Sequence, residues 1–217
     1  MLLNERVDYV ILHDADRGVS GFWAIALRYP NVFIEKIKSV ELSVEEWERQ
    51  RELYRNGNCL EAGFAAFYLN RVNYSGILSA NPIGGLDQSG KNKIDARFNR
   101  EELIKKIETL ATKRDRVGVT AQSFQYFIPA FDKTPTLLYV DPPYWKQGDK
   151  LYPCRMKRAE HVLLRDLLAA SESPWILSYD DVPEIRELYR DFRIEKVDVR
   201  YSARRIKRET ELLIRNF

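Results

Sequence analysis

The chain has 217 residues, which is enough for one sizeable hydrophobic core with a modest insertion rather than two full domains. Hydrophobic residues make up 45% of the sequence and charged residues 31%, a composition typical of an ordinary soluble globular protein. The formal net charge is only +3, so the overall charge does not by itself argue for a polyanionic partner.

The few cysteines and histidines exclude several kinds of site. Cys59 and Cys154 are too far apart for a disulfide framework or a paired zinc knuckle, which favours a reducing, cytoplasmic setting. His13 and His161 are too few and too isolated to build a metal site, so no metal is expected. Asn4, Glu5 and Arg6 directly after two leucines leave no room for a signal-peptide core, and no apolar run approaches about 20 residues. We therefore expect a protein that is neither exported nor membrane-bound.

The first half of the chain begins with a strand and continues with helices. Residues 8–14 (DYVILHD) form a short, β-branched apolar run that predicts a buried strand. Residues 21–37 are predicted to be helical with a break near Pro30. Ser43, followed by Glu46, predicts a capping box at the start of the next helix.

A nearly all-apolar segment and a long irregular segment follow. Residues 60–70 (LEAGFAAFYLN) predict a buried helix. Between residues 71 and 99, glycines, a proline and several Asn and Ser residues interrupt every periodicity, which predicts a long loop or irregular hairpin of the kind that is usually functional. Asn99 with Glu102 then predicts the start of another helix.

After residue 116 the pattern predicts strands. Residues 116–123, 136–141 and 175–180 are strand candidates, and apolar residues with helical spacing separate the last two. This alternation predicts parallel crossovers and the α/β class. Residues 193–203 and 209–217, joined by a basic turn, predict a terminal antiparallel hairpin. In open α/β sheets the active site lies beyond the carboxyl ends of the strands, where Asp14, Ser123, Asp141 and Asp180 fall.

The stretch DPPY, Asp141 to Tyr144, can be interpreted as a simple turn after a strand. Its residues also suit a specific chemistry. Pro142 and Pro143 stiffen the backbone and carry no N–H, so the segment presents carbonyl acceptors beside a carboxylate. Two acceptors side by side match an exocyclic amino group. If Asp141 and the Pro142 carbonyl each accept one N–H, the nitrogen lone pair becomes available to attack an electrophile. Tyr144 can stack on the heterocycle that carries the amine.

DPPY resembles the catalytic motif of S-adenosylmethionine-dependent amino-methyltransferases. Together with ILHDADRGVSGFW, FYLNRVNYSGIL, NPIGG, DARFN and WILSYD, it is similar in kind and order to the Dam-like (D12-class) DNA adenine-N6 methyltransferases over essentially the whole chain. The resemblance implies a Rossmann-like, mostly parallel sheet with a C-terminal antiparallel hairpin. It also implies a catalytic core of residues 1–40 and 117–217 and an inserted, mainly helical target-recognition region of residues 41–116.

The resemblance also implies which residues bind the cofactor. Asp14 resembles the acid that binds the ribose hydroxyls of S-adenosylmethionine, and a carboxylate at a strand end suits a diol in its own right. The alternative is that Asp14 is a simple helix N-cap. Ser123 stands where the family has an acid that reads the cofactor's adenine amine, and Phe124 stands where a ring packs beside that adenine.

Double-stranded DNA is the expected partner. Asn70, Arg71 and Tyr74 resemble a DNA-contacting loop of the insert, although helix termination and turn formation would explain the same residues. Residues 71–116 and residues 196–215 each carry a net charge of +4, and such basic patches fit phosphate contacts, as they fit a merely solvated face. The basic candidates are Arg97, Arg204, Arg205 and Lys207.

The family's first strand and its glycine-rich cofactor loop should lie upstream of residues 2–16. From the sequence as it stands we expect that first strand to be missing, so that a partner or an upstream segment completes the sheet. We also expect the 217-residue chain alone to bind S-adenosylmethionine weakly or not at all.

The leading hypothesis is site-specific methylation of adenine N6 in DNA, in a restriction-modification system or a mobile element. The alternatives are a catalytically inactive DNA-binding remnant of such an enzyme, and an enzyme acting on RNA or a free base.

Overall fold

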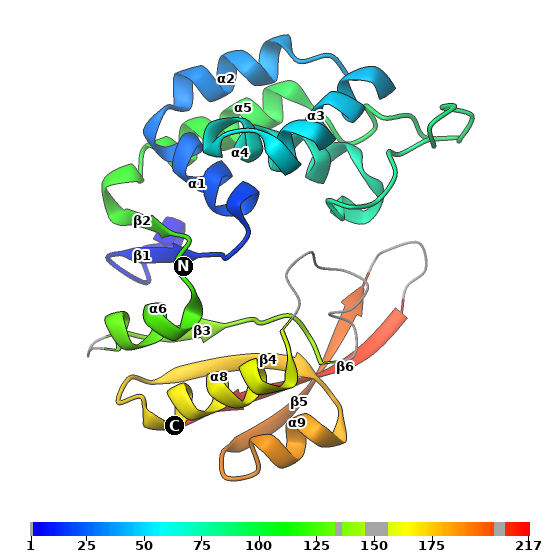
Figure 1. Cartoon of the computed structure of the whole chain (residues 1–217). Coiled ribbons are helices and arrows are strands. Elements are labelled where there is room, and N and C mark those ends of the chain that lie inside the picture. The colour runs from blue at the N-terminus through cyan, green and yellow to red at the C-terminus, as the bar shows by residue number, and fades with distance from the viewer. Residues whose placement is uncertain (1, 133–135, 146–155, 202–206) are drawn as a thin grey trace. The chain divides into compact units, whose positions relative to one another are not determined.

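The computed structural model describes residues 2–132, 136–145, 156–201 and 207–217, and the chain divides into two compact units, Met1–Gln122 and Ser123–Phe217 (Figure 1). Helices and strands occur in both units, which confirms the α/β class. Among the described residues, no helix combines the length and the apolarity that crossing a membrane requires.

The first unit is a group of helices beside a two-stranded sheet. Its helices are α1 (Arg17–Arg28), α2 (Pro30–Ser39), α3 (Val44–Asn56), α4 (Cys59–Val72) and α5 (Arg100–Ala111), with short 3-10 turns η1 (Leu2–Asn4), η2 (Tyr74–Gly76) and η3 (Arg114–Arg116). The predicted break at Pro30 is confirmed, because α1 ends at Arg28 and α2 begins at Pro30. The predicted start at Ser43 is also confirmed, since the Ser43 side chain accepts from the Glu46 N–H. The predicted capping box forms only in this half among the described residues, because the Glu46 carboxylate accepts from the Gln50 amide instead. The helices enclose a core rich in aromatic rings, among them Phe33, Trp47, Phe64, Tyr68 and Phe98.

Helices α1 and α4 cross with their backbones in contact, because glycine stands on both sides of the crossing. A Cβ atom at Gly63 would lie 2.5 Å from the carbonyl carbon of Gly21 and 2.6 Å from the Phe22 nitrogen. A Cβ atom at Gly21 would lie 2.6 Å from the Cys59 carbonyl oxygen. Real Cβ atoms do not approach backbone atoms so closely, so the two glycines permit this helix separation. The prediction that residues 60–70 form a buried helix is confirmed for most of α4, although Leu60 at its start is 52% exposed.

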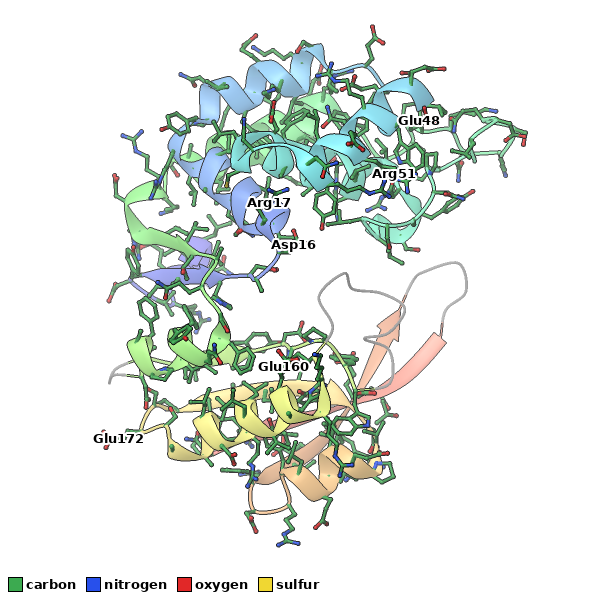
Figure 2. All side chains as sticks on the ribbon, in the orientation of Figure 1. Asp16, Arg17, Glu48, Arg51, Glu160 and Glu172 are labelled. Carbon is green, nitrogen blue, oxygen red and sulfur yellow. The ribbon has the colours of Figure 1, made fainter. Side chains whose placement is uncertain are left out.

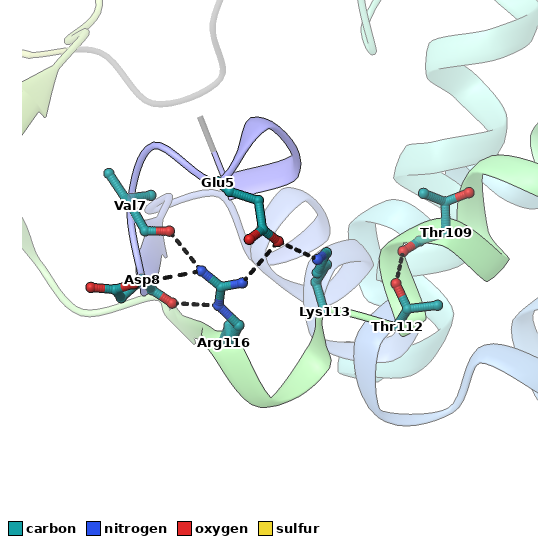
Figure 3. A network of polar contacts seen from close by, with 7 residues as sticks. All are labelled: Glu5, Val7, Asp8, Thr109, Thr112, Lys113 and Arg116. Carbon is teal, nitrogen blue, oxygen red and sulfur yellow. Dashed lines mark hydrogen bonds and ion pairs between the residues drawn. The ribbon is translucent and has the colours of Figure 1, made fainter.

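Strands β1 (Val10–His13) and β2 (Val117–Thr120) pair in parallel, with Val10 opposite Val117. Figure 3 shows how the segment before β1 is fixed to the turn before β2. The Arg116 guanidinium donates to the Val7 and Asp8 carbonyl oxygens at 2.8 and 2.7 Å, and the Lys113 ammonium lies 3.1 Å from a Glu5 carboxylate oxygen. These contacts align the N-terminal strand with a segment more than 100 residues later.

The segment between α4 and α5 is irregular, as predicted, and is ordered by two amide side chains. Asn73 is fully buried, accepts from the Trp47 indole N–H at 2.7 Å, and donates to the Ile77 and Leu78 carbonyl oxygens. The Gln88 side chain donates to the Ile83 and Gly85 carbonyl oxygens and accepts from a later backbone N–H. The sharp turn at Gly85 has a φ of 82°, which favours glycine.

The second unit is built on a four-stranded sheet of order β3-β4-β6-β5. Its strands are β3 (Leu138–Val140), β4 (Trp175–Asp180), β5 (Arg193–Tyr201) and β6 (Lys207–Arg215), and its helices are α6 (Phe124–Phe131), α8 (Arg158–Ala170) and α9 (Pro183–Leu188). Strands β3 and β4 are parallel, while β6 is antiparallel to both β4 and β5. The parallel crossover through α8 and the terminal hairpin are therefore confirmed.

The second core lies against this sheet. Trp175, Leu177 and Tyr179 alternate along β4 and are fully buried, and Leu164 and Leu168 of α8 belong to the same cluster. The alternation places the residues between them, Ile176 and Ser178, on the opposite face of the strand.

The described strands form two hydrogen-bonded sheets, and β1 and β3 each have a strand neighbour on one side within the described residues. Whether another strand joins them into a single Rossmann-like sheet stays a prediction. The catalytic-core and insert boundaries also stay predictions about function. The compact units divide elsewhere because α1 and α2 share a core with α4 and α5.

Candidate functional site

The segment Asp141–Trp145 leaves the carboxyl end of β3 next to the carboxyl end of β4. The parallel register sets Val140 beside Leu177, so the residues that follow, Asp141 and Ser178, meet where the pairing ends. The Ser178 hydroxyl donates to Asp141 Oδ1 at 2.8 Å. The Trp145 backbone N–H donates to Asp180 Oδ1 at 2.9 Å. Both ends of the segment are thereby bound to β4.

Aromatic side chains of α8 and β4 pack against this segment. The Trp145 ring lies 4.9 Å from the His161 ring of α8, and His161 Nδ1 is 2.6 Å from the Tyr179 hydroxyl. The Tyr144 ring centroid lies 6.4 Å from that of Tyr179. Glu160, beside His161 at the start of α8, is labelled in Figure 2. Tyr144 is half-buried, so part of its surface remains open to solvent for stacking.

Burial and neighbouring groups set the protonation of the site. Asp141 is exposed, yet the protein atoms around its carboxyl desolvate it in part and raise its pKa. The Ser178 hydrogen bond lowers this pKa, and the charge of Glu211 raises it. Burial lowers the pKa of His161, so its neutral form is favoured. Burial also raises the pKa of Tyr179, which keeps its proton. Among the described residues, no group donates to the second oxygen of Asp141.

Asp14 follows β1 in the first unit and is half-buried. Its Oδ1 accepts from the Asp16 N–H at 2.8 Å, and burial raises its pKa. The helix N-cap is Asp16, which is labelled at the start of α1 in Figure 2. Its carboxylate accepts from the Gly18 and Val19 N–H groups and from the Tyr54 hydroxyl. The alternative interpretation of Asp14 as the N-cap of α1 is therefore wrong. Asp14 Oδ2 has no partner among the described residues.

Ser123 and Phe124 begin the second unit at the start of α6. Ser123 is the N-cap residue of this helix but its side chain makes no capping hydrogen bond, and it is exposed. Phe124 is half-buried and packs against the second core. An exposed hydroxyl and a fixed ring fit the two contacts expected of them with an adenine, and their roles stay predictions.

Three of the predicted DNA-contacting residues, with Arg97, lie around the turn after α4. Asn70 donates to the Gly76 carbonyl oxygen at 2.9 Å and accepts from the Arg71 guanidinium, so its amide shapes the turn. Burial and the nearby charge of Arg97 lower the pKa of Arg71. Tyr74 is 45% exposed. Neither Arg71 nor Arg97 forms an ion pair with a carboxylate in the described part of the chain.

The second basic candidate group falls mostly outside the described residues. Arg204 and Arg205 lie in the undescribed range 202–206, and Lys207 is the first residue of β6. Their predicted contact with DNA stays a prediction. In the described ranges, no three His, Cys, Asp or Glu side chains gather closely enough to hold a metal ion.

Sequence reasoning missed three groups that the structure places at these sites. Ser178 holds Asp141, the His161–Tyr179 pair backs Trp145, and Asn73 shapes the turn that carries Tyr74. A weak signal existed for Ser178, because it is a hydroxyl within an otherwise apolar strand run. Nothing local distinguishes Asn73 from the other Asn residues of its loop.

Comparison with known proteins places the chain in a family. A Type II methyltransferase, M.CviBI of Paramecium bursaria Chlorella virus NC1A, is 23% identical over 159 residues, which are 70% of this chain and 59% of the viral protein. The chain thus spans about three fifths of the length of that relative. Residues 4–203 match the D12 class N6 adenine-specific DNA methyltransferases, so the chain belongs to this family.

Proposed function

We propose that this chain transfers a methyl group from S-adenosylmethionine to the N6 amino group of adenine in DNA. The observation that carries the proposal is the carboxylate of Asp141. It stands at the carboxyl end of β3, is held through one oxygen by Ser178, and is followed by two prolines and a half-buried tyrosine. Family membership and the viral Type II relative support the same chemistry.

The residues of the segment suit an aromatic amine. Asp141 Oδ2 and the Pro142 carbonyl oxygen can each accept one N–H of the amino group, which draws the nitrogen out of conjugation with its ring. The Tyr144 ring can stack on an adenine that has been flipped out of the duplex. Positioning the nitrogen in line with the methyl donor is then the main contribution of the protein to the rate.

Three residues are the candidates for holding the cofactor. Asp14 Oδ2 is available to accept from a ribose hydroxyl, since within the described residues only Oδ1 has a partner. Phe124 offers a fixed ring and Ser123 an exposed hydroxyl for the adenine of the cofactor. S-adenosylmethionine supplies the electrophilic methyl group when it is bound.

The DNA backbone would be bound in part by Arg71 and Arg97. These like charges are close enough for one to lower the pKa of the other, and an anion between them would relieve their repulsion. A phosphate group of double-stranded DNA has that charge. The Type II relative favours a place in a restriction-modification system, in which case methylation protects one base sequence.

The test is methyl transfer by the full chain from radiolabelled S-adenosylmethionine to duplex DNA of mixed sequence, compared with Asp141→Asn and Asp141→Ala. Both variants should lose transfer, because neither presents a charged acceptor, and both should keep DNA binding. Asp166→Asn, which removes an exposed carboxylate of α8, is the control and should change nothing.

Two outcomes would contradict the proposal. Normal transfer by Asp141→Ala would refute the role of the carboxylate. Binding of DNA without binding of S-adenosylmethionine, measured by calorimetry, would favour the inactive DNA-binding remnant instead.

A further inference from the structure

The carboxyl end of β4 presents two polar residues to the segment Asp141–Trp145. Ser178 and Asp180 are two residues apart in the strand and therefore project to the same face of the sheet. Ser178 binds the first residue of the segment through its hydroxyl, and Asp180 binds the Trp145 backbone. The two ends of the segment are thus held by one strand, at points separated by one strand repeat.

We propose that Ser178 is a positioning residue for the methyl transfer inferred above: its hydroxyl binds Asp141 Oδ1 and reserves Oδ2, as a charged acceptor, for the amino group of the substrate. Ser178 does not touch the substrate and acts through Asp141. This inference rests on the proposed function for its consequence, but the Ser178–Asp141 contact can be tested in the protein alone.

The electrostatic surroundings explain why such a donor is needed. Desolvation and the charge of Glu211 both favour the protonated form of Asp141. A protonated carboxyl would offer an O–H donor where the substrate offers N–H donors, and the two would repel. Within the described part of the chain, the Ser178 hydroxyl is the one group that shifts the pKa of Asp141 toward the ionised form.

The same unit contains a second serine–aspartate pair that does not depend on one hydroxyl. At the opposite end of β4, the Ser171 hydroxyl donates to Asp132 Oδ1 at 2.7 Å, and the backbone N–H groups of Glu172 and Ser173 donate to the same carboxylate. This pair closes the turn before β4. Its serine is a matched control, because its removal deletes a hydrogen bond of the same type far along the strand from Asp141.

The experiment measures the ionisation of Asp141 by carbon-13 NMR of its carboxyl group in the full chain, assigned by loss of the signal in Asp141→Asn. Ser178→Ala should raise the pKa of Asp141, Ser178→Thr should leave it near the wild-type value, and Ser171→Ala should not move it. An unchanged Asp141 titration in folded Ser178→Ala would overturn the proposal, as would an equal shift in Ser171→Ala.

The consequence for transfer is measured with the same variants across pH. Ser178→Ala should lower the rate by roughly 10- to 100-fold, the usual effect of losing a hydrogen bond to a charged group. The acid limb of its pH profile should move to higher pH, and Ser178→Thr should restore both. An equal loss of rate at every pH, with an unchanged acid limb, would show that Ser178 contributes only to packing. Absence of transfer in the wild-type chain, with the NMR shift present, would instead refute the methyl transfer and leave the control of Asp141 by Ser178 standing.

Discussion

Replacing Gly63 by alanine should destabilise the first unit, although alanine is the better helix former. The added methyl group would lie 2.5 Å from the carbonyl carbon of Gly21 and 2.6 Å from the Phe22 nitrogen. Both are backbone atoms within α1 and cannot rotate away as a side chain can. The two helices must therefore separate, and the packing between them must loosen along its length.

The magnitude follows from two opposing effects. Alanine in place of glycine within a helix gains about 1 kcal/mol of helix propensity. Overpacking a well-filled contact costs about 1–3 kcal/mol, and rigid backbone neighbours put this site at the upper end. We therefore expect the free energy of unfolding to fall by about 2 kcal/mol.

The assay is chemical denaturation followed by circular dichroism, with hydrogen exchange to localise the change to α1 and α4. Gly118→Ala is the control, because its methyl group would meet only the end of the Tyr9 side chain, which is 54% exposed and can move. The control should change stability by less than about 0.5 kcal/mol. A Gly63→Ala variant as stable as the wild type would refute the inference that the glycines set the helix separation.

Three further predictions concern the other sites. Tyr144→Ala should weaken binding of DNA that contains a flipped adenine by about 1–3 kcal/mol, the contribution of one base–aromatic stack. Tyr144→Phe keeps the ring face and should lose much less affinity. Equal losses in an equilibrium titration would show that the hydroxyl matters instead of stacking. Arg71→Gln or Arg97→Gln should weaken DNA binding and reduce the slope of log affinity against log salt concentration by about 0.9 for each phosphate that the variant no longer neutralises. Arg49→Gln, which changes an exposed arginine, is the control. An unchanged slope would show that Arg71 and Arg97 are surface residues that do not contact phosphate. The Ser171 hydroxyl lowers the pKa of Asp132, so the ionised carboxylate stabilises the fold above the ordinary aspartate pKa of about 4 and loses that contribution as pH falls further. In urea unfolding, Asp132→Asn should therefore have a lower free energy of unfolding than the wild type at pH 7, and the difference should shrink toward about pH 3. A difference that does not change with pH would contradict this linkage.

The sequence predicted the elements of this fold well where local patterns decide them. The apolar run of β4, the Ser43 cap of α3 and the break at Pro30 depend on neighbours within a few residues. The hairpin of β5 and β6 was also predicted. Its order in the sheet was not, because β6 lies between β4 and β5, and a pairing partner far along the chain leaves no local signal.

The candidate site was predicted in part for the same reason. Asp141 and Tyr144 belong to a short motif that can be read from the chain. Ser178 is 37 residues from Asp141, and the two meet only because β3 and β4 pair in one register. The role of Asn73 could not be predicted either, because its buried amide binds Trp47, which lies 26 residues earlier in the chain. Asp16, rather than Asp14, caps α1 because a cap is decided by backbone angles at the helix start.

The contacts of Arg116 with the start of the chain affect the order in which the elements can fold during translation. This side chain binds the Asp8 carbonyl 108 residues earlier, and the parallel partner of β1 begins one residue after Arg116. At about 5–20 residues per second, a ribosome needs on the order of 5–20 seconds to make the intervening chain. Helices α1 to α4 can pack during that interval, whereas residues 10–13 emerge first and wait for their strand partner. Slowing translation should therefore lengthen the exposure of β1, the earliest of the described strands to be made, more than that of any helix between.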